Sequence, residues 1–235
     1  MAEEIRLIRK RLESNVDELT KSTAQRYFKE TVRLYGVGSA LVGKIAADSF
    51  QSMESKSKAE IFALCEELWT SGMLEESFIA CEWSYRLRSF YSPEDIHVFE
   101  RWIDNWVDNW ASCDTLCNHS VGSLVEGFPQ NCAVLKQWTC SGNRWKRRAA
   151  AVSLVVPARK GAFLGECLEI ASLLLEDDDD LVRKGYGWML KEASRTHQDE
   201  VFAFVMQHKA RMPRTALRYA IEKMPPEMKR LAMEK

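Results

Sequence analysis

Residues 176–185 read Glu-Asp-Asp-Asp-Asp-Leu-Val-Arg-Lys-Gly, an acidic run that leads directly into an apolar and basic segment. An aspartate just before a helix accepts hydrogen bonds from the free amides of the first turn, and further carboxylates suit the positive end of the helix dipole. The run therefore predicts a helix that contains Leu181 to Lys184, and we mark this helix in the repeat at Gly185. Comparable helix starts recur at steps of roughly 35 residues, with a shorter last step, near Ala80, Asp114, Ala149, Gly185 and Ala216.

A regular step of this length is typical of stacked helix pairs. Nearly every segment has apolar residues at helical spacing, and none alternates like a strand over more than a few residues. Turn signals such as Ser92-Pro93 and Gly127-Phe128-Pro129 separate about a dozen helices of roughly 12 to 18 residues. We expect an all-α protein: an α-solenoid of HEAT-like helical repeats (an α-α superhelix), one domain over residues 1–235, with a concave basic cleft.

Charge is distributed unevenly along the chain, although the net charge is only −1. Residues 1–53 have a net charge of +2, residues 54–135 of −9 and residues 136–235 of +6. The basic residues of the last region form three clusters: Arg144, Lys146, Arg147 and Arg148; Arg183 and Lys184; Arg211, Arg214 and Arg218. Segregated positive charge can bind a phosphate backbone even when the total is near zero. The alternative is that these clusters are solvated helix faces.

Composition favours a soluble protein of a reducing compartment. The chain has 235 residues, of which 46% are hydrophobic, enough for a substantial core. No run approaches the 18 or more apolar residues of a membrane span, and the first ten residues contain no hydrophobic signal region. Seven cysteines, an odd number without a secretory signal, do not fit a disulfide framework. We expect a cytoplasmic protein without a membrane partner.

Residues 38–45 resemble a phosphate-binding loop without completing it. Gly38 to Lys44 read Gly-Ser-Ala-Leu-Val-Gly-Lys, but Ile45 lacks the hydroxyl group that would hold magnesium. The segment also follows a helical stretch rather than a strand. We therefore expect a turn between helices here, and no nucleotide site.

Four cysteines and a histidine between residues 113 and 140 raise the possibility of zinc. Cys113, Cys117 and His119, followed by Cys132 and Cys140, match no tight zinc spacing. Cys113 and Cys117 are more simply small apolar residues one turn apart on a buried stripe. No histidine is visibly placed to activate a thiol. We expect neither a metal nor a cofactor.

The repeat also predicts which side chains share a surface. Residues one period apart lie side by side in a stack, so Asp114, with Trp110 one turn before it, should neighbour Arg148. By the same step, Arg148 should neighbour Lys184 and Trp188. One carboxylate, two indoles and a basic pair would then converge on one wall.

With these residues the chain resembles the HEAT-like DNA glycosylases that remove alkylated purines, the bacterial alkylpurine glycosylase D family. The resemblance runs from about Tyr27 to Lys223 and rests on three motifs: Trp110-x3-Asp114, Trp145-x2-Arg148-Ala149-Ala150 and Lys184-x2-Gly187-Trp188-x-Leu190. It implies that Asp114 is the catalytic carboxylate and that Trp110 and Trp188 contact the sugar of the damaged nucleotide. Arg148 would hold the backbone beside it, and Tyr27 matches a further cleft residue.

The resemblance implies a DNA repair enzyme of the 3-methyladenine or 7-methylguanine glycosylase type, acting on alkylated duplex DNA as a monomer. The bond cleaved would be the N-glycosidic bond of a cationic N3- or N7-alkylated purine. An open solenoid cleft offers no obvious deep pocket, and the resemblance implies that the lesion stays stacked rather than flipped. The expected DNA-binding residues are Arg148, Tyr27, Arg147, Lys184 and Arg214. The alternative is a non-catalytic HEAT-like protein that binds branched or bent DNA, or a protein-interaction scaffold.

Overall fold

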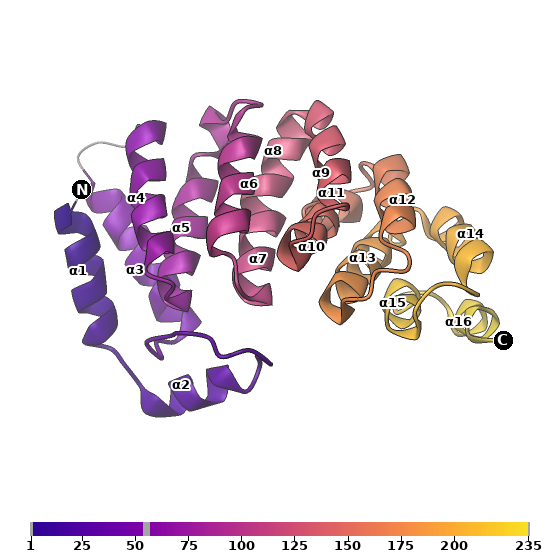
Figure 1. Ribbon diagram of the computed structural model, residues 1–235, viewed down its shortest axis with the longest axis horizontal. Coiled ribbons are helices and arrows are strands. Elements are labelled where there is room, and N and C mark those ends of the chain that lie inside the picture. The colour runs from indigo at the N-terminus through magenta and orange to yellow at the C-terminus, as the bar shows by residue number, and fades with distance from the viewer. Residues whose placement is uncertain (1, 54–56, 235) are drawn as a thin grey trace. The chain divides into compact units, whose positions relative to one another are not determined.

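The computed structural model describes residues 2–53 and 57–234, and every regular element within these ranges is a helix. The described chain divides into two compact units. The first unit comprises residues 2–53, 57–92 and 105–116, and the second comprises residues 93–104 and 117–234. Figure 1 shows the helices in chain order. No helix in the described ranges has both the length and the apolar character needed to cross a membrane.

Six α-helices and a short 3-10 turn build the first unit. They are α1 (Ala2–Glu13), α2 (Glu18–Gln25), α3 (Ser39–Ser52), α4 (Lys58–Thr70), α5 (Leu74–Arg86), η1 (Arg88–Phe90) and α7 (Trp110–Leu116). Helix α5 is central, because α3, α4 and α7 all pack against it. Its Trp83 is fully buried, and the indole Nε1 donates a hydrogen bond to the carbonyl oxygen of Ala46 in α3 at 2.9 Å. Figure 1 shows α2 set apart from α1, α3, α4 and α5.

The segment that resembles a phosphate-binding loop belongs to α3. Gly38 is the N-cap residue, and the helix continues from Ser39 through Lys44. The expectation of a turn between helices was therefore wrong over these residues. The physical reason is that neither glycine interrupts the helix: Gly38 precedes it, and Gly43 has ordinary helical geometry with open space around its Cα.

The second unit contains helix α6 (Asp95–Trp106) up to Asp104 and all elements after α7. These are η2 (Cys117–Val121, a π-helical turn), α8 (Gly122–Gly127), η3 (Pro129–Asn131), α9 (Cys132–Trp138), α10 (Arg144–Val152), α11 (Val155–Arg159), α12 (Leu164–Leu173), α13 (Asp180–Ala193), α14 (Gln198–His208), α15 (Arg214–Ala220) and α16 (Pro226–Met233). Helix α13 packs against α10, α11, α12 and α15. Its contact with α15 depends on Gly187, where a Cβ atom would lie 2.8 Å from the carbonyl oxygen of Ala216.

The helix starts confirm a repeat of HEAT-like helical units, with a more even period than the sequence indicated. Helices α5, α7, α10, α13 and α15 begin at Leu74, Trp110, Arg144, Asp180 and Arg214, at steps of 34 or 36 residues. Each expected start lies inside its helix, and the short last step disappears. At α10 and α13 the reason is that a polar cap, not the small residue used to mark the repeat, fixes the first turn. Asn143 caps α10 through the amide of Trp145, at 3.0 Å, and Asp179 caps α13.

The described residues contain sixteen α-helices rather than about a dozen. Segments that the sequence pattern joined are divided by short turns, as between α10 and α11, where Ser153 and Leu154 separate the helices. The expected cleft and the expected single domain stay predictions.

Candidate functional site

Asp114 and Trp110 lie one turn apart on α7, and both side chains are partly exposed. The opposite face of α7 is buried, which fixes the helix in the first unit. Its start is held by Asn109, whose side-chain oxygen accepts a hydrogen bond from the Ser112 amide at 2.9 Å. Asn109 is itself only 3% exposed. The local sequence therefore presents one carboxylate and one indole at i and i+4, positions that share a helix face.

A segment distant in sequence holds the indole of Trp110. Residues Asp17–Gly38, here called the arm, include α2 and the loop that follows it. The indole Nε1 of Trp110 donates a hydrogen bond to the carbonyl oxygen of Tyr27 at 3.3 Å, and the ring stacks on Phe28 with centroids 5.4 Å apart. The side chain of Tyr27 is 71% exposed. The structure thus brings together two of the residues expected at the site, Tyr27 and Trp110.

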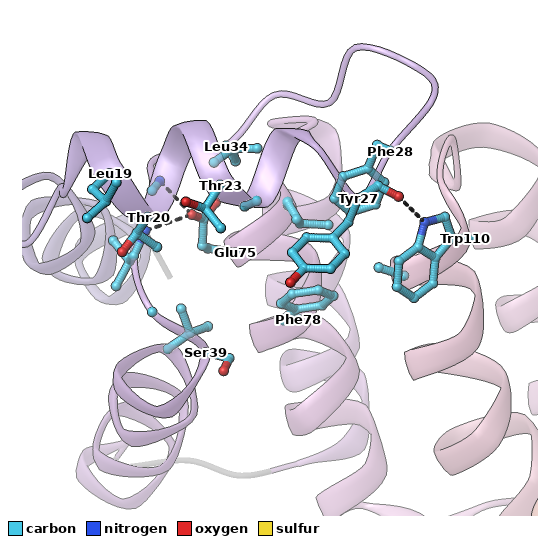
Figure 2. A pocket seen from close by; sticks show the side chains of 17 residues that line it. Leu19, Thr20, Thr23, Tyr27, Phe28, Leu34, Ser39, Glu75, Phe78 and Trp110 are labelled. Carbon is cyan, nitrogen blue, oxygen red and sulfur yellow. Dashed lines mark hydrogen bonds between the residues drawn. The ribbon is translucent and has the colours of Figure 1, made fainter.

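A pocket of about 650 Å³ lies between the arm and helices α3, α5 and α7. Figure 2 shows the rings of Tyr27, Phe28, Phe78 and Trp110 gathered toward one end of it, and Leu19, Thr20 and Ser39 toward the other. That the expected cleft offers no deep pocket for a rotated base stays a prediction. Helical periodicity does not predict how a loop folds back over neighbouring helices, and the arm forms one wall of this pocket.

The far end of the arm is tied to α5 by a buried carboxylate. Glu75 is 3% exposed and accepts hydrogen bonds from the backbone amides of Tyr35, Gly36 and Val37 at 3.0, 2.8 and 3.0 Å. Gly36 has a φ of +95°, and a Cβ atom there would lie 2.7 Å from the Cβ of Lys21. Sequence reasoning missed Glu75, because a glutamate in an amphipathic helix usually faces solvent.

Glu76, the next residue of α5, is fully buried and strengthens this anchor. Its carboxylate accepts hydrogen bonds from the Tyr35 hydroxyl at 2.7 Å and from the Arg9 guanidinium at 3.0 to 3.2 Å. Burial, together with the hydrogen bond to Glu76, raises the pKa of Tyr35, so this hydroxyl stays a donor at neutral pH. The two carboxylates therefore hold the end of the arm together: Glu75 binds the backbone amide of Tyr35, and Glu76 binds its hydroxyl group.

Arg148, Lys184 and Trp188 lie in the second unit. Arg148 on α10 is 5% exposed, and its guanidinium donates a hydrogen bond to the carbonyl oxygen of Leu181 in the first turn of α13. A Cβ atom at Gly185 would lie 3.4 Å from the Cγ of Arg148. Arg148 therefore packs against the first turns of α13 at Leu181 and Gly185, and that it neighbours Lys184 and Trp188 stays a prediction. Lys184 and Trp188 lie one turn apart on α13 and are partly exposed. Convergence of these residues with Asp114 stays a prediction.

The acidic run engages two of the four basic residues that were expected to bind DNA. Arg147 pairs with Asp177 at 2.7 Å, and Lys184 pairs with Asp180 at 2.7 Å. Asp179 caps α13 by accepting from the amides of Leu181 and Val182, as the sequence predicted. Arg214 differs, because its side chain is exposed and makes only long contacts, 3.4 and 3.5 Å, with a backbone carbonyl.

The cysteines are mostly core residues. Cys113 and Cys117 are buried, as expected. Burial raises the pKa of Cys65, Cys81 and Cys167, which keeps these thiols protonated and unreactive. Within residues 2–53 and 57–234, no three His, Cys, Asp or Glu side chains cluster as metal ligands. That the protein needs no metal stays a prediction.

Comparison with known proteins gives a family and a fold. A family model described as DNA alkylation repair enzyme matches residues 8–224. A solved structure, the predicted DNA alkylation repair enzyme from Enterococcus faecalis, has a TM-score of 0.79 at 16% identity, over 90% of this chain and 98% of that one. The Pseudomonas fluorescens alkylpurine DNA glycosylase AlkC, bound to DNA containing an abasic site analog, has a TM-score of 0.49 at 16% identity. This match covers 78% of this chain and 52% of that one. A search of curated proteins finds no significant match.

Proposed function

Since this chain belongs to the DNA alkylation repair enzyme family, we propose that it hydrolyses the N-glycosidic bond of cationic N3- or N7-alkylated purines in duplex DNA. The observation that carries the proposal is the pair on α7, in which the partly exposed carboxylate of Asp114 lies one turn from the anchored indole of Trp110. The pair offers negative charge and an aromatic face at one place on the protein surface.

The chemistry of the substrate explains why so few groups suffice. A purine alkylated at N3 or N7 carries a positive charge, so the base leaves as a neutral molecule and needs no acid to protonate it. The sugar develops oxocarbenium-like positive charge as the bond breaks. Water then adds its oxygen to C1′ and gives up a proton. Negative charge placed beside the sugar stabilises this transition state directly.

In this proposal, Asp114 stabilises the sugar cation, positions the attacking water and accepts the proton that this water gives up. Trp110 adds a cation–π attraction of about 0.5 to 2 kcal/mol. The hydrogen bond to Tyr27 and the stacking on Phe28 hold this indole in place, so little rotamer freedom is lost on binding. Trp188 would contribute a second indole.

Duplex DNA is the proposed partner. Arg148 would bind the backbone beside the lesion after its buried guanidinium leaves the carbonyl oxygen of Leu181. Tyr27, Arg147, Lys184 and Arg214 would be further contacts. Arg147 and Lys184 would first have to leave their ion pairs with Asp177 and Asp180. We propose a monomer that acts in the cytoplasm without a metal or cofactor, because a carboxylate and two indoles supply the charge stabilisation. The lesion would remain stacked, since its own charge provides the selectivity.

We expect the protein to release 3-methyladenine or 7-methylguanine from methylated duplex DNA, and to leave uracil and hypoxanthine in place. Uracil and hypoxanthine are neutral in DNA and are therefore poorer leaving groups than a cationic alkylated purine. The proposed site contains no general acid that would protonate them. Chromatography of the released bases after incubation with each type of DNA measures this. Efficient release of uracil would contradict the mechanism, and DNA binding without release of any base would favour the non-catalytic alternative.

A further inference from the structure

The arm carries four exposed basic side chains that the sequence analysis did not assign to any function. They are Lys21, Arg26, Lys29 and Arg33. None of the four forms an ion pair with any residue in the ranges 2–53 and 57–234. Two of them directly flank the aromatic pair Tyr27 and Phe28 in the sequence Arg-Tyr-Phe-Lys. Exposed cations interleaved with an exposed aromatic ring are typical of nucleic-acid binding surfaces.

Four basic residues of the second unit are in a different state, whereas Arg214 and Arg218 are exposed and form no ion pair within the described residues. Arg144, Arg147, Lys184 and Arg211 each pair with a member of the acidic run, Asp179, Asp177, Asp180 and Glu176 in that order. A cation that already has a carboxylate partner must exchange that partner for a phosphate, which reduces the net gain. A solvated cation has only its water and the phosphate's counterions to displace, and release of those counterions drives binding. The arm cations are therefore better suited to bind phosphate than these four paired residues.

The arm is also fixed relative to the candidate catalytic residues of its own unit. Trp110 bonds to the backbone of Tyr27, and Phe28 stacks on the same indole. At the other end, Glu75 holds the amides of residues 35–37. Arg26 and Lys29 are thus each within two residues of a direct contact with Trp110. If a sugar of the bound strand lies at Trp110, the phosphates next to it would lie close to the segment 26–29.

We propose that Arg26 and Lys29 form a phosphate-binding element for duplex DNA that flanks the Tyr27–Trp110 contact. The inference rests on the proposed function for the position of the DNA. It makes the arm a source of sequence-independent affinity that acts separately from the basic clusters of the second unit. Lys21 and Arg33 lie further along the arm and would add weaker, longer-range attraction.

The test measures binding of the full chain to undamaged duplex DNA between about 50 and 200 mM salt. The double variant Arg26→Ala/Lys29→Ala should reduce the magnitude of the slope of log affinity against log salt by about 1.8, or about 0.9 for each lost phosphate contact. The affinity at the lowest salt should fall by at least about tenfold. Lys10→Ala is the matched control, because Lys10 is an exposed cation of α1 in the same unit. The salt slope of this control variant should equal that of the unmodified protein.

Two further measurements separate the possible outcomes. The charge-preserving variant Arg26→Lys/Lys29→Arg should keep the slope, which identifies charge rather than local folding as the cause. A double alanine variant with an unchanged slope and an unchanged melting temperature overturns the inference. Release of alkylated bases by the unmodified protein is measured separately: a protein that releases none, but whose slope falls in the double variant, contradicts the proposed function and leaves the arm's role standing.

Discussion

Asp114→Asn is expected to lower the single-turnover rate of base release from methylated duplex DNA by roughly 10² to 10⁴. The change removes the negative charge beside the developing sugar cation and weakens the positioning of the water. Asparagine has almost the same shape and Asp114 is only partly buried, so the fold and most of the DNA affinity should persist. Rates under enzyme excess, together with the DNA dissociation constant, measure both effects.

Asp108→Asn is the matched control for this experiment. Asp108 is exposed, precedes α7 and accepts a hydrogen bond from the Asn109 side chain. Its replacement by asparagine also removes one negative charge, at a position six residues before Asp114. It should leave the rate within a factor of a few. An Asp114→Asn protein with full activity would move the catalytic role to another residue.

Glu75→Ala is expected to lower the free energy of unfolding by about 3 kcal/mol and to loosen the arm. The alanine leaves the amides of residues 35–37 without their acceptor, and an unsatisfied buried amide costs about 1 to 3 kcal/mol. Urea denaturation measures the loss of stability. Hydrogen exchange of residues 17–38 measures the loosening, and faster exchange there should accompany slower base release, because Tyr27 then no longer holds the Trp110 indole.

Glu75→Gln serves as the comparison, since the amide oxygen can still accept hydrogen bonds from Gly36 and Val37. Its loss of stability should be clearly smaller than that of the alanine variant. If Glu75→Ala unfolds at the same urea concentration as the unmodified protein and its arm exchanges no faster, the arm is not anchored in the way described.

The repeat was predictable from the sequence because it depends on local chemistry. Caps such as Asp179 and the apolar spacing of each helix act within a few residues, so the all-α repeat follows from them. The pairing of Arg148 with the start of α13 also follows, because helices one period apart pack together.

The arm and its pocket depend on contacts between residues far apart in the sequence. The bond from Trp110 to Tyr27 joins residues 83 positions apart, and Glu75 reaches about 40 residues back to its amides. Neither contact leaves a periodic signal. Gly36 was the one local hint, since its positive φ requires a residue without a Cβ atom. The ion pairs of Arg144, Arg147 and Arg211 with the acidic run were missed for the same reason, because each joins residues far apart in the sequence.

Hydrolysis of duplex DNA containing a single 7-methylguanine, carried out in water enriched in ¹⁸O, tests the central claim most directly. We expect mass spectrometry to find intact 7-methylguanine in solution without the label, and one ¹⁸O atom on the C1′ of the abasic sugar left in the strand. Two results would contradict the assignment of glycosidic bond hydrolysis to this protein. One is loss of the methyl group with guanine still attached to the DNA, and the other is recovery of the DNA with its 7-methylguanine unreacted.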